Sequence, residues 1–186
     1  MHGYAAKDLA RSFRTVRNNT IKIAEEIPED KYSFRPAEGC RTVGETLAHL
    51  AAASSWPKGL HSSGVTHPTF ETFREGMAKA MEYEKSLSTK EAILNALKTG
   101  GDDFANWLDT VPDSLLEEQV HFPEGIEPRV KTRFEMLLAT KEHEMHHRAQ
   151  LMVVERMLGI VPHLTREMQA RMAAFEQHQR SAGAAS

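Results

Sequence analysis

Residues 132–159 read TRFEMLLATKEHEMHHRAQLMVVERMLG and form the longest uninterrupted helical pattern in the chain. Thr132 and Glu135 have the spacing of a capping box, in which each side chain bonds the backbone N–H of the other residue. Gly159 stands where helices commonly end, and Pro162 lies beyond it. We therefore predict a long helix that begins after Thr132 and ends just before Gly159.

Two histidines lie on the apolar face of this helix. On a helical wheel with about 100° per residue, His143 and His147 are about 40° apart and one turn apart along the axis. His146 lies about 60° to the other side of His143. The stripe that His143 and His147 join contains Met136, Thr140, Leu151, Val154 and Leu158.

This histidine pair has two interpretations. Among ten histidines in 186 residues, a pair four positions apart arises by chance about half the time, and a buried histidine is often a hydrogen-bonded core residue. Two imidazoles on one core-facing stripe both need a hydrogen-bond or metal partner, however, because an unpaired buried polar group costs about 1–3 kcal/mol. A shared divalent ion is a partner for both rings, so we favour metal ligation.

A third ligand is available in the second predicted helix, where His49 lies. Alanines make the surface of that helix apolar nearly all round, so the wheel does not show which way His49 points. Five of the other histidines fall in predicted loops, in a linker or near the termini, and we expect them to be solvated. These are His2, His61, His67, His121 and His178.

Helical periodicity recurs along the chain while strand patterns are nearly absent, so we predict an all-α antiparallel bundle of four principal helices with additional short helices. The predicted helices cover residues 9–27, 42–56, 70–83, 88–111 and 132–158, with a short one from about 165. Pro57 follows the second helix and predicts a loop over 57–69. No composition shift divides the chain, which predicts one domain over 1–180 and a flexible tail over 181–186.

Composition excludes several classes of protein. The net charge is −3, the pI is near 6.4 and no basic block occurs, which argues against nucleic-acid binding. A single cysteine excludes a disulfide framework. No apolar run approaches the roughly 18 residues of a membrane span, and the N-terminus does not resemble a signal peptide. We therefore expect a soluble, cytoplasmic protein that does not bind a membrane.

Residues 143–147 also match H-E-x-x-H, the zincin protease signature in which the glutamate is the general base. Gln150 stands where the metzincin extension of this signature requires glycine. Glu167 is at a possible distance for the other zincin pattern, but no strand is readable that would hold a peptide substrate. This match gives a metal-dependent hydrolase as an alternative.

Four segments resemble the DinB-like family in their order and spacing. The segments at 41–49 and 143–150 are the most specific of the four. The four segments are YSFRPAEG at 32–39, RTVGETLAH at 41–49, HEMHHRAQ at 143–150 and LGIVP at 158–162. The resemblance covers about residues 5–165. Ala149 replaces the usual glycine of the third segment, which is a small change on a helix, and residues 57–90 are less typical.

This resemblance implies an up-down-down-up four-helix bundle, a homodimer, and a divalent metal held by His49, His143 and His147. Three neutral imidazoles leave at least one position of the metal open, as in catalytic sites. Characterised relatives, including mycothiol-dependent maleylpyruvate isomerases, activate a low-molecular-weight thiol. The resemblance therefore favours a zinc- or nickel-dependent transferase that uses such a thiol on a small-molecule substrate.

Other roles remain open at the level of sequence. Glu144 is expected either at the rim of the site, as a general base or a partner of a ligand, or as a solvated charge beside the stripe. Arg148 is expected in an ion pair, His146 at a helix interface, and Cys40 as an unreactive loop residue. A non-enzymatic bundle is a further alternative, and it predicts that a fourth protein ligand closes the metal site.

Overall fold

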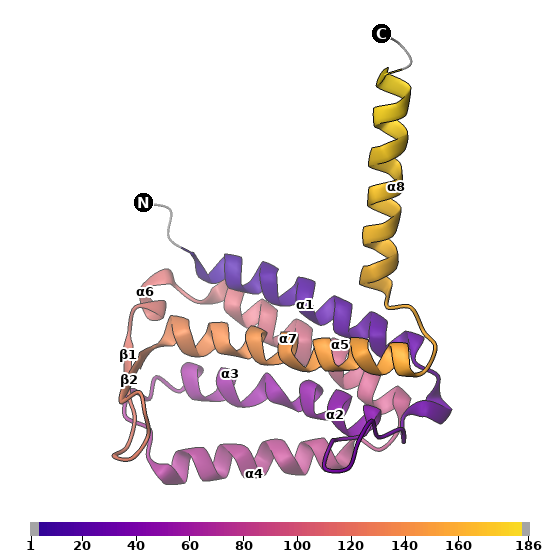
Figure 1. The fold of residues 1–186 in the computed structure, drawn as a ribbon. Helices are drawn as coiled ribbons and strands as arrows, with labels where there is room; N and C mark the ends of the chain where they lie inside the picture. Colours follow the sequence, from indigo (N-terminus) through magenta and orange to yellow (C-terminus); the bar gives the residue numbers. More distant parts are fainter. Residues whose placement is uncertain (1–3, 184–186) are drawn as a thin grey trace.

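The computed structural model describes residues 4–183 and consists of four bundle helices, further helices and a pair of short strands (Figure 1). The bundle helices are α1 (Ala6–Glu26), α2 (Val43–Ala53), α5 (Lys90–Thr110) and α7 (Arg133–Met157). The other elements are η1 (Glu29–Lys31), α3 (Ser55–Ser62), α4 (Phe70–Ser86), α6 (Asp113–Leu116), β1 (Gln119–His121), β2 (Val130–Thr132) and α8 (His163–Gly183). The predicted all-α class and four-helix bundle are confirmed.

The topology is up-down-down-up. In Figure 1, α1 and α7 run in one direction, whereas α2 and α5 run in the other. Helix α4 carries the chain back along the outside of α2, which allows α2 and α5 to be parallel neighbours. As a result α2 and α7, the helices that carry the candidate ligands, run antiparallel to each other.

The ends of the bundle helices are set by local hydrogen bonds, as the sequence predicts. Thr42 Oγ1 accepts from the backbone N–H of Glu45 at 3.1 Å, and the Glu45 carboxylate accepts from the N–H of Thr42 at 2.7 Å. The same reciprocal pair joins Thr132 and Glu135 at the start of α7. Helix α7 ends before Gly159, whose φ of 78° lies in the left-handed region that glycine adopts without strain.

The core of the bundle is divided into two apolar clusters. On α1, one cluster extends as far as Phe13 and the other begins at Ile21. On α7, the corresponding residues are Leu137 and Leu151. The stretches between them carry polar side chains, so a polar layer crosses the middle of the bundle. The candidate metal ligands of α7 lie in this layer.

Several local predictions were wrong. Residues 57–62, which were expected in a loop, belong to α3, because Pro57 occupies the first helical turn, where a missing N–H breaks no helical hydrogen bond. Although no strand was expected, β1 pairs antiparallel with β2 and places Val120 opposite Lys131. Strands of three residues are too short to show a periodicity of two.

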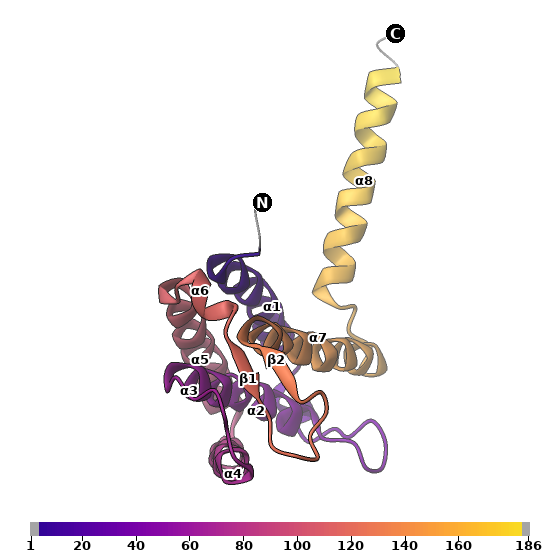
Figure 2. The same cartoon turned by 90° about the vertical axis from the view of Figure 1, so that its left-hand side faces the viewer.

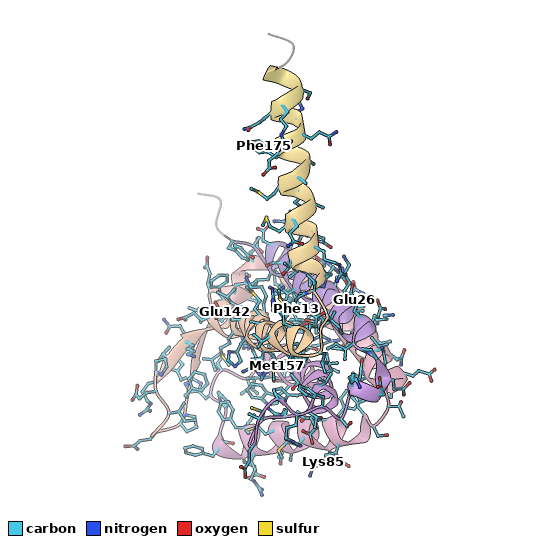
Figure 3. All side chains as sticks on the ribbon, turned by 45° about the vertical axis from the view of Figure 1, so that its right-hand side comes forward. Phe13, Glu26, Lys85, Glu142, Met157 and Phe175 are labelled. Atoms are coloured by element: carbon cyan, nitrogen blue, oxygen red, sulfur yellow. The ribbon has the colours of Figure 1, made fainter. Side chains whose placement is uncertain are left out.

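Helix α8 is not the short helix that was expected, because it spans 21 residues. It projects away from the bundle and contacts α1 near its own start (Figures 1 and 2). Phe175 lies on the projecting part, whereas Met157 lies at the end of α7 (Figure 3). Residues 181–183 of the expected tail belong to α8, and 184–186 lie outside the described residues. Among residues 4–183, no helix is long and apolar enough to cross a membrane.

Candidate metal centre

The structure brings the three predicted ligands together. One nitrogen from each of His49, His143 and His147 lies within 4.8 Å of the other two. His49 Nε2 and His143 Nε2 are 3.1 Å apart, although these residues are far apart in the chain. The ring centroids of His143 and His147 are 4.7 Å apart, and those of His49 and His147 are 5.1 Å apart. His49, whose direction the wheel left undecided, therefore faces α7.

Outer hydrogen bonds orient two of the three rings. His49 Nδ1 donates to Glu84 Oε2 at 2.9 Å, and His147 Nδ1 donates to Gln150 Oε1 at 2.8 Å. Because Nδ1 is the donor in both rings, Nε2 keeps its lone pair in both. Metal-binding histidines commonly have such partners, which fix the tautomer and the orientation of the ring. Sequence reasoning missed both partners: Gln150 is one turn from its histidine, but nothing in the sequence points to Glu84 on α4.

Burial disfavours the protonated form of two of the three imidazoles, those of His143 and His147. Burial lowers the pKa of His143 from 6.5 to about 4, and the neighbouring His147 and His49 lower it further. Burial also lowers the pKa of His147, although the hydrogen bond with Gln150 opposes the change. Neutral imidazole is the form that binds a metal ion. At neutral pH the rings of His143 and His147 are therefore in the form that binds a metal ion.

The donor set fits a divalent ion such as zinc or nickel. The hydrogen bonds to Glu84 and Gln150 direct the Nε2 lone pairs of His49 and His147. His143 Nε2 lies beside His49 Nε2. Borderline metals prefer imidazole nitrogen ligands of this kind. Among residues 4–183, the group of possible ligands contains these three histidines and no carboxylate or thiolate.

A cavity of about 480 Å³ adjoins His147, one of the three candidate ligands. His147 and Gln150 form one part of its wall, and Cys40 and Arg41 from the loop before α2 form another. The remaining lining is mostly apolar and comprises Pro36, Gly39, Val43, Thr46, Leu151, Val153, Val154 and Met157. Cys40 is exposed and has no disulfide partner. The cavity can receive a small molecule with an apolar part next to His147.

The structure buries Glu144 instead of placing it at the rim or in solvent. Its side chain is 2% exposed, and both oxygens accept hydrogen bonds from Arg17 Nε, at 2.9 and 3.0 Å. Arg148 has no ion pair among the described residues, and its Nε is buried without a hydrogen-bond partner. His146 is exposed instead of lying at a helix interface, and it accepts a hydrogen bond from Gln150.

The remaining histidines are spread over the molecule, and His163 is buried at the start of α8. His61 was expected to be solvated but is 2% exposed, because α3 carries it against Arg133, which donates to His61 Nδ1 at 3.0 Å. Burial, together with Arg133, lowers the pKa of His61 to about 4. His67 and His121 stack on each other with centroids 4.7 Å apart. His178 is exposed on α8, and His2 lies outside the described residues.

Comparison with known proteins supports the resemblance seen in the sequence. YjoA of Bacillus subtilis (strain 168) is 26% identical over 155 residues, which cover 83% of this chain and 91% of YjoA. The crystal structure of YjoA, a DinB-like protein, matches 82% of this chain and 92% of its own with a TM-score of 0.61 and 22% identity.

A second solved structure has the same fold. YfiT from Bacillus subtilis, described as a probable metal-dependent hydrolase with an unusual four-helix bundle topology, matches with a TM-score of 0.64 and 16% identity. The match covers 86% of this chain and 91% of YfiT. The model of the DinB family matches residues 2–180, nearly the whole sequence. The chain therefore belongs to the DinB family.

Proposed function

We propose that this protein is a metal-dependent enzyme in which His49, His143 and His147 hold a zinc or nickel ion. The observation that carries the proposal is the convergence of three imidazoles without a fourth protein ligand among residues 4–183. Structural zinc sites are closed by four protein ligands, whereas catalytic sites keep a position open. This difference favours an enzyme over a bundle in which the metal only joins helices.

We further propose transfer to or from a low-molecular-weight thiol. A divalent ion at this site supplies a Lewis acid that lowers the pKa of a thiol or water. Three neutral ligands leave the positive charge uncompensated, which favours an anionic sulfur. In the transfer the sulfur forms a bond to an electrophilic carbon of the substrate, the thiol proton passes to solvent, and the leaving group departs with its electron pair.

The residues around the site support this chemistry. Glu84 and Gln150 hold two of the ligand rings in one tautomer. The apolar wall formed by Val43, Leu151 and Val154 limits the access of water to one side of the site. We propose that the apolar part of the electrophile occupies this cavity, next to His147.

Hydrolysis is the alternative, and the description of YfiT as a probable metal-dependent hydrolase supports it. A zincin-type hydrolase would need Glu144 as a general base near the ligands. Both oxygens of that carboxylate instead bond Arg17 in the core, and the carboxylate is not part of the ligand group. If hydrolysis occurs, we expect it to use water without help from Glu144.

A metal analysis of protein purified without a histidine tag tests the proposal. We expect about one zinc or nickel ion per chain, lost in His49→Ala, His143→Ala and His147→Ala but kept in the exposed control His178→Ala. Protein that takes up no metal contradicts the proposal. A zincin-type site predicts that His49→Ala keeps its metal.

A screen of thiol cosubstrates with a chromogenic aryl chloride then tests the reaction class. We expect thiol-dependent chloride release by the metal-loaded wild type and none by His143→Ala. Ester hydrolysis without a thiol, in the absence of transfer, would favour the hydrolase.

A further inference from the structure

Arg17 forms hydrogen bonds to the three other bundle helices from its position on α1. Its side chain is 4% exposed, and its Nε donates to both oxygens of Glu144 on α7. Nη1 donates to the carbonyl of Leu97 on α5 at 3.0 Å, and Nη2 donates to the carbonyl of Leu50 on α2 at 3.1 Å. The guanidinium therefore joins α2, α5 and α7 at one point in the polar layer.

The neighbours of Arg17 leave room for this arrangement. A Cβ atom built on Gly101 of α5 would lie 2.7 Å from Arg17 Cγ, closer than side-chain atoms pack. Glycine within a helix costs about 1 kcal/mol relative to alanine, so its presence here indicates a local need for space. The guanidinium carbon also lies 5.1 Å from the centre of the Phe13 ring. Arg17 is thus held in one position from several sides.

Two of the three partners are adjacent in sequence to candidate metal ligands. Leu50 follows His49, and Glu144 follows His143. One planar guanidinium therefore connects the backbone beside one ligand to the side chain beside another. Because its donors form a rigid fork, the group fixes the relative position of the partners it bonds.

We propose that Arg17, acting through Glu144, is a positioning residue of the metal site, because it sets the spacing between α2 and α7. This inference rests on metal binding by the histidines and does not depend on which reaction the enzyme catalyses. It assigns Glu144 a role in site geometry instead of a role as general base. Neither residue belongs to the group of possible ligands or lines the cavity beside His147.

A general structural role would predict a different result. Replacing a buried ion pair with apolar residues of similar volume is often neutral or stabilising, because both charges are then relieved of their desolvation cost. The double variant Arg17→Met/Glu144→Leu therefore leaves no unpaired buried charge. If the pair only supports the fold, this variant should bind metal as the wild type does.

The experiment measures the zinc Kd of metal-free protein by competition with a chromogenic chelator at pH 7, together with thermal unfolding. We expect zinc binding by Arg17→Met/Glu144→Leu to weaken about 10–100-fold, as is typical when groups behind metal ligands are removed. The matched control is Arg133→Met. Arg133 is also a buried arginine, but it lies on α7, ten positions from His143. The control should unfold at a lower temperature and keep the wild-type Kd.

A folded double variant with the wild-type Kd overturns the proposal. If the double variant lacks the helical circular dichroism of the wild type, Arg17→Lys decides instead. Lysine keeps the charge beside Glu144 but lacks the fork that reaches all three helices. We expect weaker zinc binding by folded Arg17→Lys, and an unchanged Kd overturns the proposal. Wild-type protein that does not bind zinc would instead refute the metal site itself.

Discussion

Replacing the buried carboxylate of Glu155 with an amide should stabilise the protein at neutral and alkaline pH. Glu155 is completely buried on α7, and neither carboxylate oxygen has a hydrogen-bond partner among residues 4–183. Burial raises its pKa from 4.5 to about 7, and the nearby Glu26 adds to this rise, while Arg166 and Arg156 oppose it. Ionisation of Glu155 therefore lowers the free energy of unfolding.

The size and sign of the effect follow from proton linkage. Between pH 4.5 and about 7 the folded chain keeps a proton on Glu155 that the unfolded chain has lost, so stability falls as the pH rises. Each pKa unit corresponds to about 1.4 kcal/mol, so the rise to about 7 makes the wild type lose on the order of 3 kcal/mol across this range. Glu155→Gln stays neutral and avoids the loss.

Urea unfolding of metal-free wild type and Glu155→Gln at pH 5, 6, 7 and 8 measures this difference. We expect similar stabilities near pH 5 and a growing advantage of the variant that levels off above about pH 7. Comparison with the variant removes the contribution of other titrating groups. The exposed control Glu176→Gln should follow the wild type. A stability difference that does not change with pH would refute the reasoning.

The remaining predictions concern the site, the core and assembly. Glu84→Gln should weaken zinc binding about 10–100-fold in a chelator competition, because Glu84 orients the His49 ring. The control Glu82→Gln, at an exposed position on the same helix, should not weaken it. Gly101→Ala should cost about 1–3 kcal/mol in urea unfolding, because the new methyl group overlaps a buried arginine. Gly100→Ala should instead stabilise by up to about 1 kcal/mol, since its nearest new contact is 3.6 Å away, and equal effects of the two would contradict this. The implied homodimer should be seen by light scattering after size-exclusion chromatography. If the exposed apolar face of α8 contributes to it, Phe175→Asp should weaken the dimer, and a monomeric wild type would refute the implication.

Local features of the sequence were sufficient to predict the bundle helices. The capping residues Thr42 and Thr132 act within one helical turn, so their effect does not depend on the rest of the fold. His143 and His147 were correctly placed near each other for the same reason, because residues four apart on a helix share a face. The short strands and α3 escaped prediction, since short segments have too few residues to show a period.

Only the tertiary structure decided how the site is completed. His49 lies on an alanine-rich helix that is apolar nearly all round, so its direction depended on which helix packs against it. Glu84 reaches His49 from α4, and no local pattern relates the two. Glu144 could not be assigned for a similar reason, because its partner Arg17 lies 127 positions away on α1. The sequence by itself determined the bundle helices and one face of the site, because those depend on neighbours along the chain, whereas the remaining ligand and the groups that orient it depend on packing between helices.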